Sequence, residues 1–263
     1  MEGVKQLKTN KITFNEAQIQ NIIQKYISGQ SCLSLGKEYN CSNKTIRRLL
    51  DKHKIINRGN RKHFYEEDIF KEINTAEKAY WLGFITADGY VNEDRGFMRI
   101  KLQECDKSHL YKFVKFIKGD EGMIKYEYHK ITGNKQYYVE VNGRSFVKTL
   151  VNLEIRQRKS MKEVWCDKIP EKYIRDYIRG IIDGDGHIDS SRVDICGSHE
   201  ILKNMQDYLI KTCNIKEGKI ANHCNTKRLC IYKNREIMLK YLYYEGCVSL
   251  DRKNKLVKKF TNK

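Results

Sequence analysis

The sequence has a single proline and only two tryptophans in 263 residues. It contains no secretory signal and no apolar run long enough to span a bilayer, so we expect no membrane association. Its nine cysteines include no Cys-x-x-Cys pair. Free thiols are typical of a reducing compartment. We therefore expect an intracellular protein, cytoplasmic in a bacterial or phage host or else organellar, and not secreted.

A zinc site is a weaker alternative for some of these cysteines. His223, Cys224 and Cys230 lie close together in the chain, but their spacing fits no standard zinc finger. We expect them to be strand and loop residues.

Acidic residues are scarce relative to basic ones. The chain has 33 Asp and Glu against 51 Lys and Arg, a net charge of +18 and a pI near 9.4. Such an excess is typical of proteins that bind a polyanion, of which nucleic acid is the commonest. A merely basic protein is the alternative. The length is sufficient for one large or two smaller domains with a real core.

One short segment of the sequence occurs twice. Residues 79–91 return as residues 176–188, at a spacing of 97 residues (185 − 88). Each copy is a helix-like apolar run that ends in an acid and a glycine. An acid at a helix C-terminus faces the negative end of the helix dipole, so two such ends call for a compensating cation. This spacing indicates a duplicated domain rather than a solenoid. The coinciding pairs are Tyr80/Tyr177, Gly83/Gly180, Ile85/Ile182, Asp88/Asp185 and Gly89/Gly186.

Three short helices are predicted before the repeat. Apolar residues between 19 and 27 follow helical spacing, and Ser31 and Ser42 are suited to cap the second and third helices. The pattern resembles the helix-turn-helix domains of resolvases and transposases over residues 14–56. We predict a DNA-binding domain at 1–57 and a basic linker at 58–73. A three-helix packing unit with a solvated charged face is the alternative. The outer face of the third helix carries Lys44, Thr45, Arg47 and Arg48.

Each copy of the repeat begins an α+β unit. Met98, Ile100 and Leu102 alternate with polar residues, which predicts a strand with one apolar face. Both copies read helix–strand–strand–helix–strand–strand–helix, over residues 74–168 and 169–263. The predicted helix-end signals are a capping box at Asn74 and Glu77, a left-handed Gly89, N-caps at Asp106 and Ser198, and Pro170 at a helix start.

Small residues on the repeated helices predict where the two copies meet. Gly83 and Gly180, followed by Ala87 and Gly184, permit two helices to pack backbone against backbone. If the copies pack about a pseudo-twofold axis, Asp88 and Asp185 lie side by side. Two neighbouring carboxylates repel unless a cation lies between them. Mg²⁺ accepts oxygen ligands and keeps water positions open, which suits phosphodiester hydrolysis.

Residues 81–89 (WLGFITADG) and 178–186 (IRGIIDGDG) resemble the LAGLIDADG motif of homing endonucleases. The resemblance covers residues 74–263. It implies two αββαββα halves in one monomeric chain, with both sheets lying over the DNA major groove and the motif helices at the centre. It further implies that Asp88 and Asp185 bind Mg²⁺ (or Mn²⁺) and cut one strand each, with backbone carbonyls of Ala87 and Gly184 as added ligands.

The same resemblance assigns further catalytic residues. Gln103 corresponds to a residue that positions water, and Lys159 and Lys253 to lysines that activate or orient water and stabilise charge. Ordinary solvated lysines are the alternative for these two. The chain also departs from the family. Thr86 replaces a frequent acid, Arg179 occupies a usually small position and is expected to face outward, and Ile195 or Cys196 stands where Gln103 sits in the first copy. We therefore expect unequal active sites.

Base reading is expected from outward residues of the strands, where long polar side chains reach the major groove. The candidates are Arg99, Lys101, Lys125 and Tyr138 in the first copy and Arg192, Lys219 and Arg228 in the second.

Three functions are compatible with the resemblance. The first is a site-specific endonuclease with a long double-stranded target, encoded within or beside a mobile intron or intergenic element. The second is a splicing maturase that binds intron RNA. The third is a DNA-binding regulator without cleavage, against which both aspartates and both lysines argue. An intein is not expected, because the terminal residues that protein splicing needs are absent.

Overall fold

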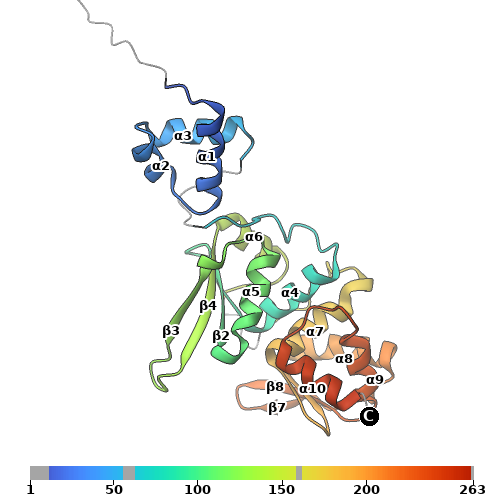
Figure 1. Cartoon of the computed structure of the whole chain (residues 1–263). Coiled ribbons are helices and arrows are strands. Elements are labelled where there is room, and N and C mark those ends of the chain that lie inside the picture. Colours follow the sequence, from blue (N-terminus) through green and yellow to red (C-terminus); the bar gives the residue numbers. More distant parts are fainter. Residues whose placement is uncertain (1–11, 56–62, 158–161, 262–263) are drawn as a thin grey trace, which may run out of the picture. The chain divides into compact units, whose positions relative to one another are not determined.

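The computed structural model describes residues 12–55, 63–157 and 162–261. The chain forms two compact units, Met1–Tyr65 and Glu66–Lys263 (Figure 1). Every helix in these described ranges is too short or too polar to cross a membrane.

The first unit holds three helices, α1 (Glu16–Ile27), α2 (Cys32–Glu38) and α3 (Asn43–Lys52). The predicted caps are confirmed, because Ser31 and Ser42 each accept a hydrogen bond from the third residue of the helix that follows. The core between the helices is made of fully buried side chains, namely Ile22, Tyr26, Leu35, Ile46 and Leu50. A short turn joins α2 to α3, as a helix-turn-helix arrangement requires.

The second unit contains two halves with the same order of elements. The first half comprises α4 (Ala76–Asp88), β1 (Gly89–Asn92), β2 (Phe97–Gln103), α5 (Lys107–Phe116), β3 (Ile124–Tyr128), β4 (Lys135–Asn142) and α6 (Arg144–Asn152). The second half comprises α7 (Ile174–Asp185), β5 (Gly186–Ile188), β6 (Val193–Gly197), α8 (His199–Cys213), β7 (Ala221–His223), β8 (Thr226–Ile231) and α9 (Arg235–Leu242). The predicted α+β fold with two αββαββα halves is confirmed.

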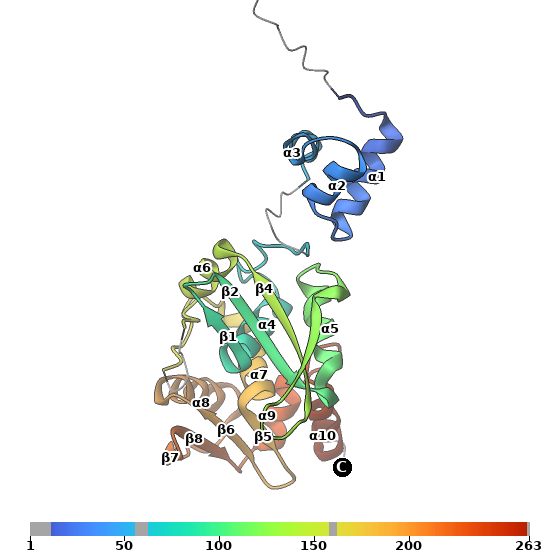
Figure 2. The same cartoon turned by 90° about the vertical axis from the view of Figure 1, so that its left-hand side faces the viewer.

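Each half builds one antiparallel four-stranded sheet. The strand orders are β1-β2-β4-β3 and β5-β6-β8-β7, so the two sheets have identical topology. The predicted alternation in β2 is confirmed: Met98 and Ile100 are fully buried, and so are Val139 and Val141 opposite them on β4. In Figure 2, strands β2 and β4 lie across helix α4, which the buried face of the sheet covers.

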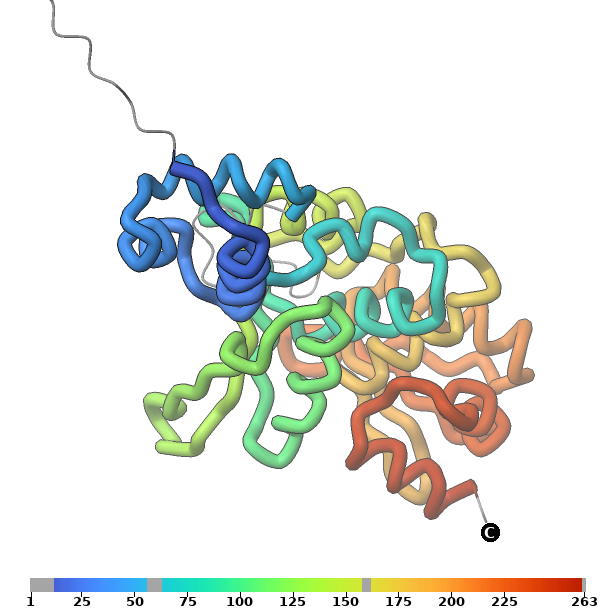
Figure 3. The backbone as a smooth tube through the Cα atoms, turned by 45° about the horizontal axis from the view of Figure 1, so that its top comes forward, coloured from blue at the N-terminus to red at the C-terminus, as the bar shows by residue number. Residues whose placement is uncertain are grey.

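A final helix, α10 (Asp251–Thr261), was not predicted from the sequence. Figure 3 traces the second half from yellow to red, and α10 packs against α9 at its end. Lys253 and Val257 face inward and the lysines around them face solvent, so a lysine occupies part of the buried face of this helix.

The boundary between the units differs from the predicted linker at 58–73. Residues 66–73 belong to the second unit, where Ile69, Phe70 and Ile73 are buried. The Phe70 ring lies 5.6 Å from that of Phe116 and 5.8 Å from that of Phe146. Burial of these apolar residues outweighs the basic character of the segment that precedes them. Residues 58–62 of the predicted linker lie outside the described residues.

Three predicted helix-end signals are wrong in detail. Thr75, not Asn74, caps α4, its hydroxyl accepting from the Lys78 amide at 3.2 Å. Asp106 makes no capping bond, because its carboxylate accepts from the Arg252 guanidinium at 2.9 and 3.1 Å. Gly89 is extended (φ −76°, ψ 134°) rather than left-handed, and glycine is needed because a Cβ there would lie 2.5 Å from the Ile85 carbonyl oxygen.

Candidate functional site

The two repeated helices, α4 and α7, pack against each other along their small residues. A Cβ added at Gly83 would overlap the carbonyl oxygen of Tyr177, and a Cβ at Gly180 would overlap that of Tyr80. The predicted contact of backbone against backbone is therefore confirmed, and it forms the seam between the halves. Because both helices run through this seam to their last residue, their C-terminal ends meet.

The ends of α4 and α7 bring two carboxylates into one neighbourhood. α4 ends at Asp88 and α7 at Asp185. A Cβ at Gly184 would overlap that of Ala87 and would lie 3.4 Å from a carboxylate oxygen of Asp88. The Asp88 carboxylate thus lies against the residue that precedes Asp185. Asp88 is half-buried and Asp185 is exposed, so this place is open to solvent.

The chemistry of these groups fits a hard divalent cation. In the part of the chain that the structure describes, no cluster of three or more His, Cys, Asp and Glu side chains could hold a metal by itself. Mg²⁺ is usually held by one or two carboxylates, with phosphate oxygens and waters completing its shell. Two aspartates, with carbonyl oxygens of Ala87 and Gly184 beside them, are a donor set of that kind.

Lys253 is buried under the end of α7. Its ammonium donates to the carbonyl oxygens of Ile182, Asp183 and Gly186 at 2.6, 2.7 and 2.6 Å. An ammonium has three protons, and all three are used here. Burial lowers the pKa of Lys253 to about 8, while the charges of Asp183, Asp88 and Asp185 act to raise it. Lys159, the corresponding predicted residue of the first half, lies outside the described residues.

Gln103 is exposed at the end of β2, on the sheet face that points away from the core. Gly89 pairs with Ile100 and Gly186 with Ile195, so strand pairing matches Gln103 to Ser198. The expected match to Ile195 or Cys196 is wrong, because the connection between the paired residues is two residues shorter in the second half. Ser198 is the N-cap of α8, and its hydroxyl donates to the Glu163 carbonyl at 2.5 Å.

Arg179 faces inward, contrary to the expectation that it faces outward. Its side chain is 1% exposed and forms an ion pair with Asp176 at 2.8 Å. It also donates to the carbonyl oxygens of Leu242 and Val248, both at 2.8 Å. These partners, together with the Tyr80 ring at 5.1 Å, compensate the buried charge.

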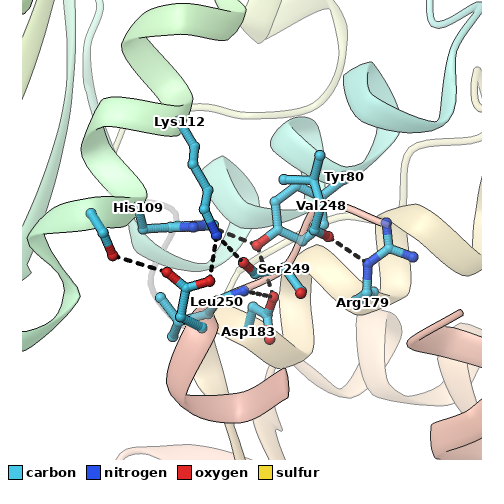
Figure 4. A network of polar contacts seen from close by, with 10 residues as sticks. Tyr80, His109, Lys112, Arg179, Asp183, Val248, Ser249 and Leu250 are labelled. Atoms are coloured by element: carbon cyan, nitrogen blue, oxygen red, sulfur yellow. Dashed lines mark hydrogen bonds and ion pairs between the residues drawn. The ribbon is translucent and has the colours of Figure 1, made fainter. Parts of the chain in front are cut away.

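A buried polar network lies beside the seam and was not predicted from the sequence (Figure 4). Asp183 accepts hydrogen bonds from the Tyr80 hydroxyl at 2.8 Å, the Tyr243 hydroxyl at 2.7 Å and the Leu250 amide at 2.7 Å. The Tyr80 hydroxyl also contacts Nε2 of His109 at 2.8 Å. Burial raises the pKa of Asp183 and lowers the pKa of His109 to about 3. The recurrence of Tyr80 as Tyr177 was the available signal.

The four strand residues predicted in the first half share the outer face of one sheet. Lys101, Tyr138 and Lys125 are direct neighbours across β2, β4 and β3. Arg99 forms an ion pair with Glu140 at 2.6 Å and lies 4.6 Å from the Tyr138 ring centre. Lys101 pairs with Glu127 at 3.0 Å. This face is therefore mixed in charge, with cations held in place by acids.

The second half differs on the corresponding face. Of its three predicted residues only Arg228 lies within a strand, where it pairs with Cys196. Arg192 precedes β6 and binds Asp194 at 2.9 Å, and Lys219 precedes β7. On α3 in the first unit, Lys44 and Arg48 are exposed, while Thr45 and Arg47 are half-buried.

Comparison with protein families identifies the first half. Residues 75–153 match the model of a family described as a LAGLIDADG-like domain. The match runs from α4 to α6. No curated protein matches the chain.

Solved structures show weaker similarity. Full-length WhiA (DUF199) from Thermatoga maritima is 19% identical, with a TM-score of 0.48, over 75% of this chain and 66% of that one, so this chain spans less than two thirds of WhiA. I-DmoI in complex with DNA and Ca is 15% identical, with a TM-score of 0.49, over 74% and 100%. The homing endonuclease I-WcaI bound to its DNA recognition sequence is 12% identical, with a TM-score of 0.46, over 74% and 87%.

Proposed function

We propose that this chain, whose residues 75–153 form a LAGLIDADG-like domain, is a site-specific endonuclease that cuts both strands of a DNA duplex with Mg²⁺ or Mn²⁺. The observation that supports this most is the meeting of Asp88 and Asp185 at the adjoining ends of α4 and α7. A net charge of +18 adds the long-range attraction that a polyanionic substrate requires.

In this proposal the chain's own residues bind and orient the substrate. Asp88 and Asp185 hold the cation, with carbonyl oxygens of Ala87 and Gly184 beside them. When bound, such a cation polarises the scissile phosphate and acidifies a coordinated water. Gln103, exposed on the first sheet, orients water in the first half. Ser198 is engaged as a helix cap, so the second half has no equivalent group and is expected to cut its strand more slowly.

The outer faces of both sheets read the target bases, and the basic face of α3 provides a second contact with DNA. Because both halves are in one chain, we propose that a monomer acts on a long asymmetric site within a mobile element. Linked modules gain affinity through their effective concentration. Intron RNA is the alternative polyanion for the same surfaces.

A cleavage-free DNA-binding role is the second candidate. It is favoured by the hydrogen bonding of Lys253, whose three protons are all directed at backbone carbonyls rather than toward the open side of the aspartates.

A cleavage selection from a randomised duplex library in Mg²⁺ distinguishes these roles. The expected result is one specific double-strand cut, which Asp88→Asn and Asp185→Asn each reduce at least about a hundredfold with DNA binding retained. A chain lacking residues 1–61 is expected to select a shorter site with a smaller salt dependence. Normal cutting of both strands by either aspartate variant would contradict the proposal that Asp88 and Asp185 bind the metal. Specific binding without any cut would favour the second candidate.

A further inference from the structure

The segment at residues 248–253 makes an unusual series of polar contacts, one at every residue. Its first three residues contribute backbone atoms. The Val248 carbonyl accepts from Arg179 at 2.8 Å, the Ser249 carbonyl accepts from Lys112 at 3.0 Å, and the Leu250 amide donates to Asp183 at 2.7 Å (Figure 4).

The last three residues contribute side chains. Asp251 accepts from Lys112 at 2.6 Å and from Ser108 at 3.1 Å. Arg252 binds the buried Asp106 at 2.9 Å. Lys253 donates to the three carbonyl oxygens at the end of α7.

These contacts divide between the two halves. In the first half, Asp106 directly precedes α5, and Ser108 and Lys112 lie on that helix. In the second half, Arg179, Asp183 and the Lys253 acceptors belong to α7 and the glycine after it. The segment therefore holds α5 and the C-terminal end of α7 at once. The carbonyl groups that Lys253 contacts lie within three residues of Asp185 in the chain.

Lys253 makes the most hydrogen bonds of any residue in this segment. The last carbonyls of a helix have no partner within the helix, and they form the negative end of its dipole. A cation placed there stabilises the end of α7 against the negative charge of Asp185. Because all three of its protons are directed to these carbonyls, Lys253 has none left to donate to a water molecule or a phosphate.

We propose that residues 248–253 are a positioning segment, in which Lys253 fixes the end of α7 and Asp251 and Arg252 fasten it to α5, so that Asp88 and Asp185 are held at the spacing the cation requires. Lys253 is then a positioning residue, rather than one that activates water. This inference rests on the proposed function insofar as the two aspartates bind a metal.

The test compares Lys253→Met with Lys253→Arg and with the control Lys255→Met, which changes an exposed lysine of the same helix. Arg252→Ala is added because Arg252 is half-exposed, so its loss is expected to leave the chain folded. Two measurements are made on the full chain. One is amide hydrogen exchange at residues 182–188, and the other is the Mn²⁺ concentration for half-maximal binding to the DNA complex, followed calorimetrically.

We expect faster exchange at residues 182–188 in Lys253→Met and Arg252→Ala, and a Mn²⁺ requirement raised at least about tenfold, as for loss of a group that orients metal ligands. Lys253→Arg is expected to recover part of both effects, and Lys255→Met to change neither. A lower cleavage rate at saturating metal, with exchange and Mn²⁺ binding unchanged, would overturn the proposal and return Lys253 to water activation.

Exchange separates this proposal from the proposed function. If the wild type neither cuts DNA nor binds Mn²⁺ but Lys253→Met and Arg252→Ala still release the end of α7, the endonuclease proposal fails and the mechanical role of the segment stands. If exchange stays at the wild-type level in both variants, the positioning proposal fails whatever the enzyme does.

Discussion

The two halves of the second unit have the same strand order in their sheets. They differ, however, in the residues that the repeated tyrosine contacts. Tyr80 of the first half donates to the Asp183 carboxylate across the seam at 2.8 Å, whereas Tyr177 of the second half contacts the Thr86 hydroxyl at 3.3 Å. Asp183 and Thr86 are the same position of the two motifs. A symmetric backbone contact thus supports a strongly polar network on one side and a weak hydroxyl pair on the other.

The difference extends to the second helix of each half. The third residue after the N-cap is His109 in α5 and Ile201 in α8, and both are buried. His109 contacts Tyr80, and Asp183 binds the amide of Leu250 in the positioning segment. Duplication therefore kept the packing that joins the helices, while the polar groups around it became different in each half.

The outer sheet faces diverged in the same way. Strand pairing matches Arg99 to Asp194 and Lys101 to Cys196. The first sheet presents cations from β2 and β3, whereas the second presents Arg228 from β8 beside a cysteine. If both faces read DNA, the two half-sites of the target differ in sequence.

The largest effect is expected at the seam, where the halves are alike. Gly83→Ala and Gly180→Ala each place a methyl group on a backbone carbonyl of the other helix, and each is expected to lower the free energy of unfolding by about 3 kcal/mol or more. Urea denaturation measures the loss. Gly133→Asn is the control, because Gly133 has a positive φ that Asn tolerates and nothing within 4 Å of its added Cβ. A stable Gly83→Ala protein would contradict the close helix contact.

The stability of the protein in acid tests the polar network around Tyr80, which has no equivalent around Tyr177 among the described residues. In the folded chain burial lowers the pKa of His109 to about 3 from its ordinary 6.5, so the unfolded chain binds a proton more readily between these values. Stability from this group is complete above pH 6.5 and is lost as pH falls toward 3, by about 3 kcal/mol at pH 4. His109→Gln keeps a donor for Tyr80 without this titration.

The measurement is the free energy of unfolding at pH 7 and pH 4 in both proteins, since both contain the same carboxyl groups. Wild type is expected to lose more stability than His109→Gln. Equal losses would mean that His109 is not a buried neutral group.

The smallest effect is expected on the outer sheet faces. Arg99→Ala and Arg228→Ala should each relax the preference at one base pair by about 1–3 kcal/mol, in opposite half-sites. Binding of a randomised library, sequenced before and after selection, measures this. Lys115→Ala, an exposed lysine on α5, is the control and should leave the preferences unchanged. Changes in the same half-site would contradict the assignment of one half to each side of the target.

Most of the secondary structure could be predicted because it follows from local rules. The alternation at residues 98–102 and the serine caps at Ser31, Ser42 and Ser198 depend on neighbours a few residues away. α10 was missed because a lysine-rich helix buries little apolar surface, and the end of the linker was missed because Phe70 is buried by Phe116 and Phe146, far along the chain.

The candidate site likewise combines features that follow from the sequence with features that depend on tertiary contacts. The sequence by itself determined the duplication, the glycines that require close helix contact and the pair of terminal acids, because these are repeated in the chain. Only the tertiary structure decided that Arg179 is buried, that Ser198 matches Gln103 and that Lys253 uses all its protons on the end of α7. The physical reason is that a buried charge is acceptable only where partners compensate it. Apart from Asp176, the hydrogen-bond partners of the Arg179 and Lys253 side chains come from segments 63 to 71 residues away in sequence.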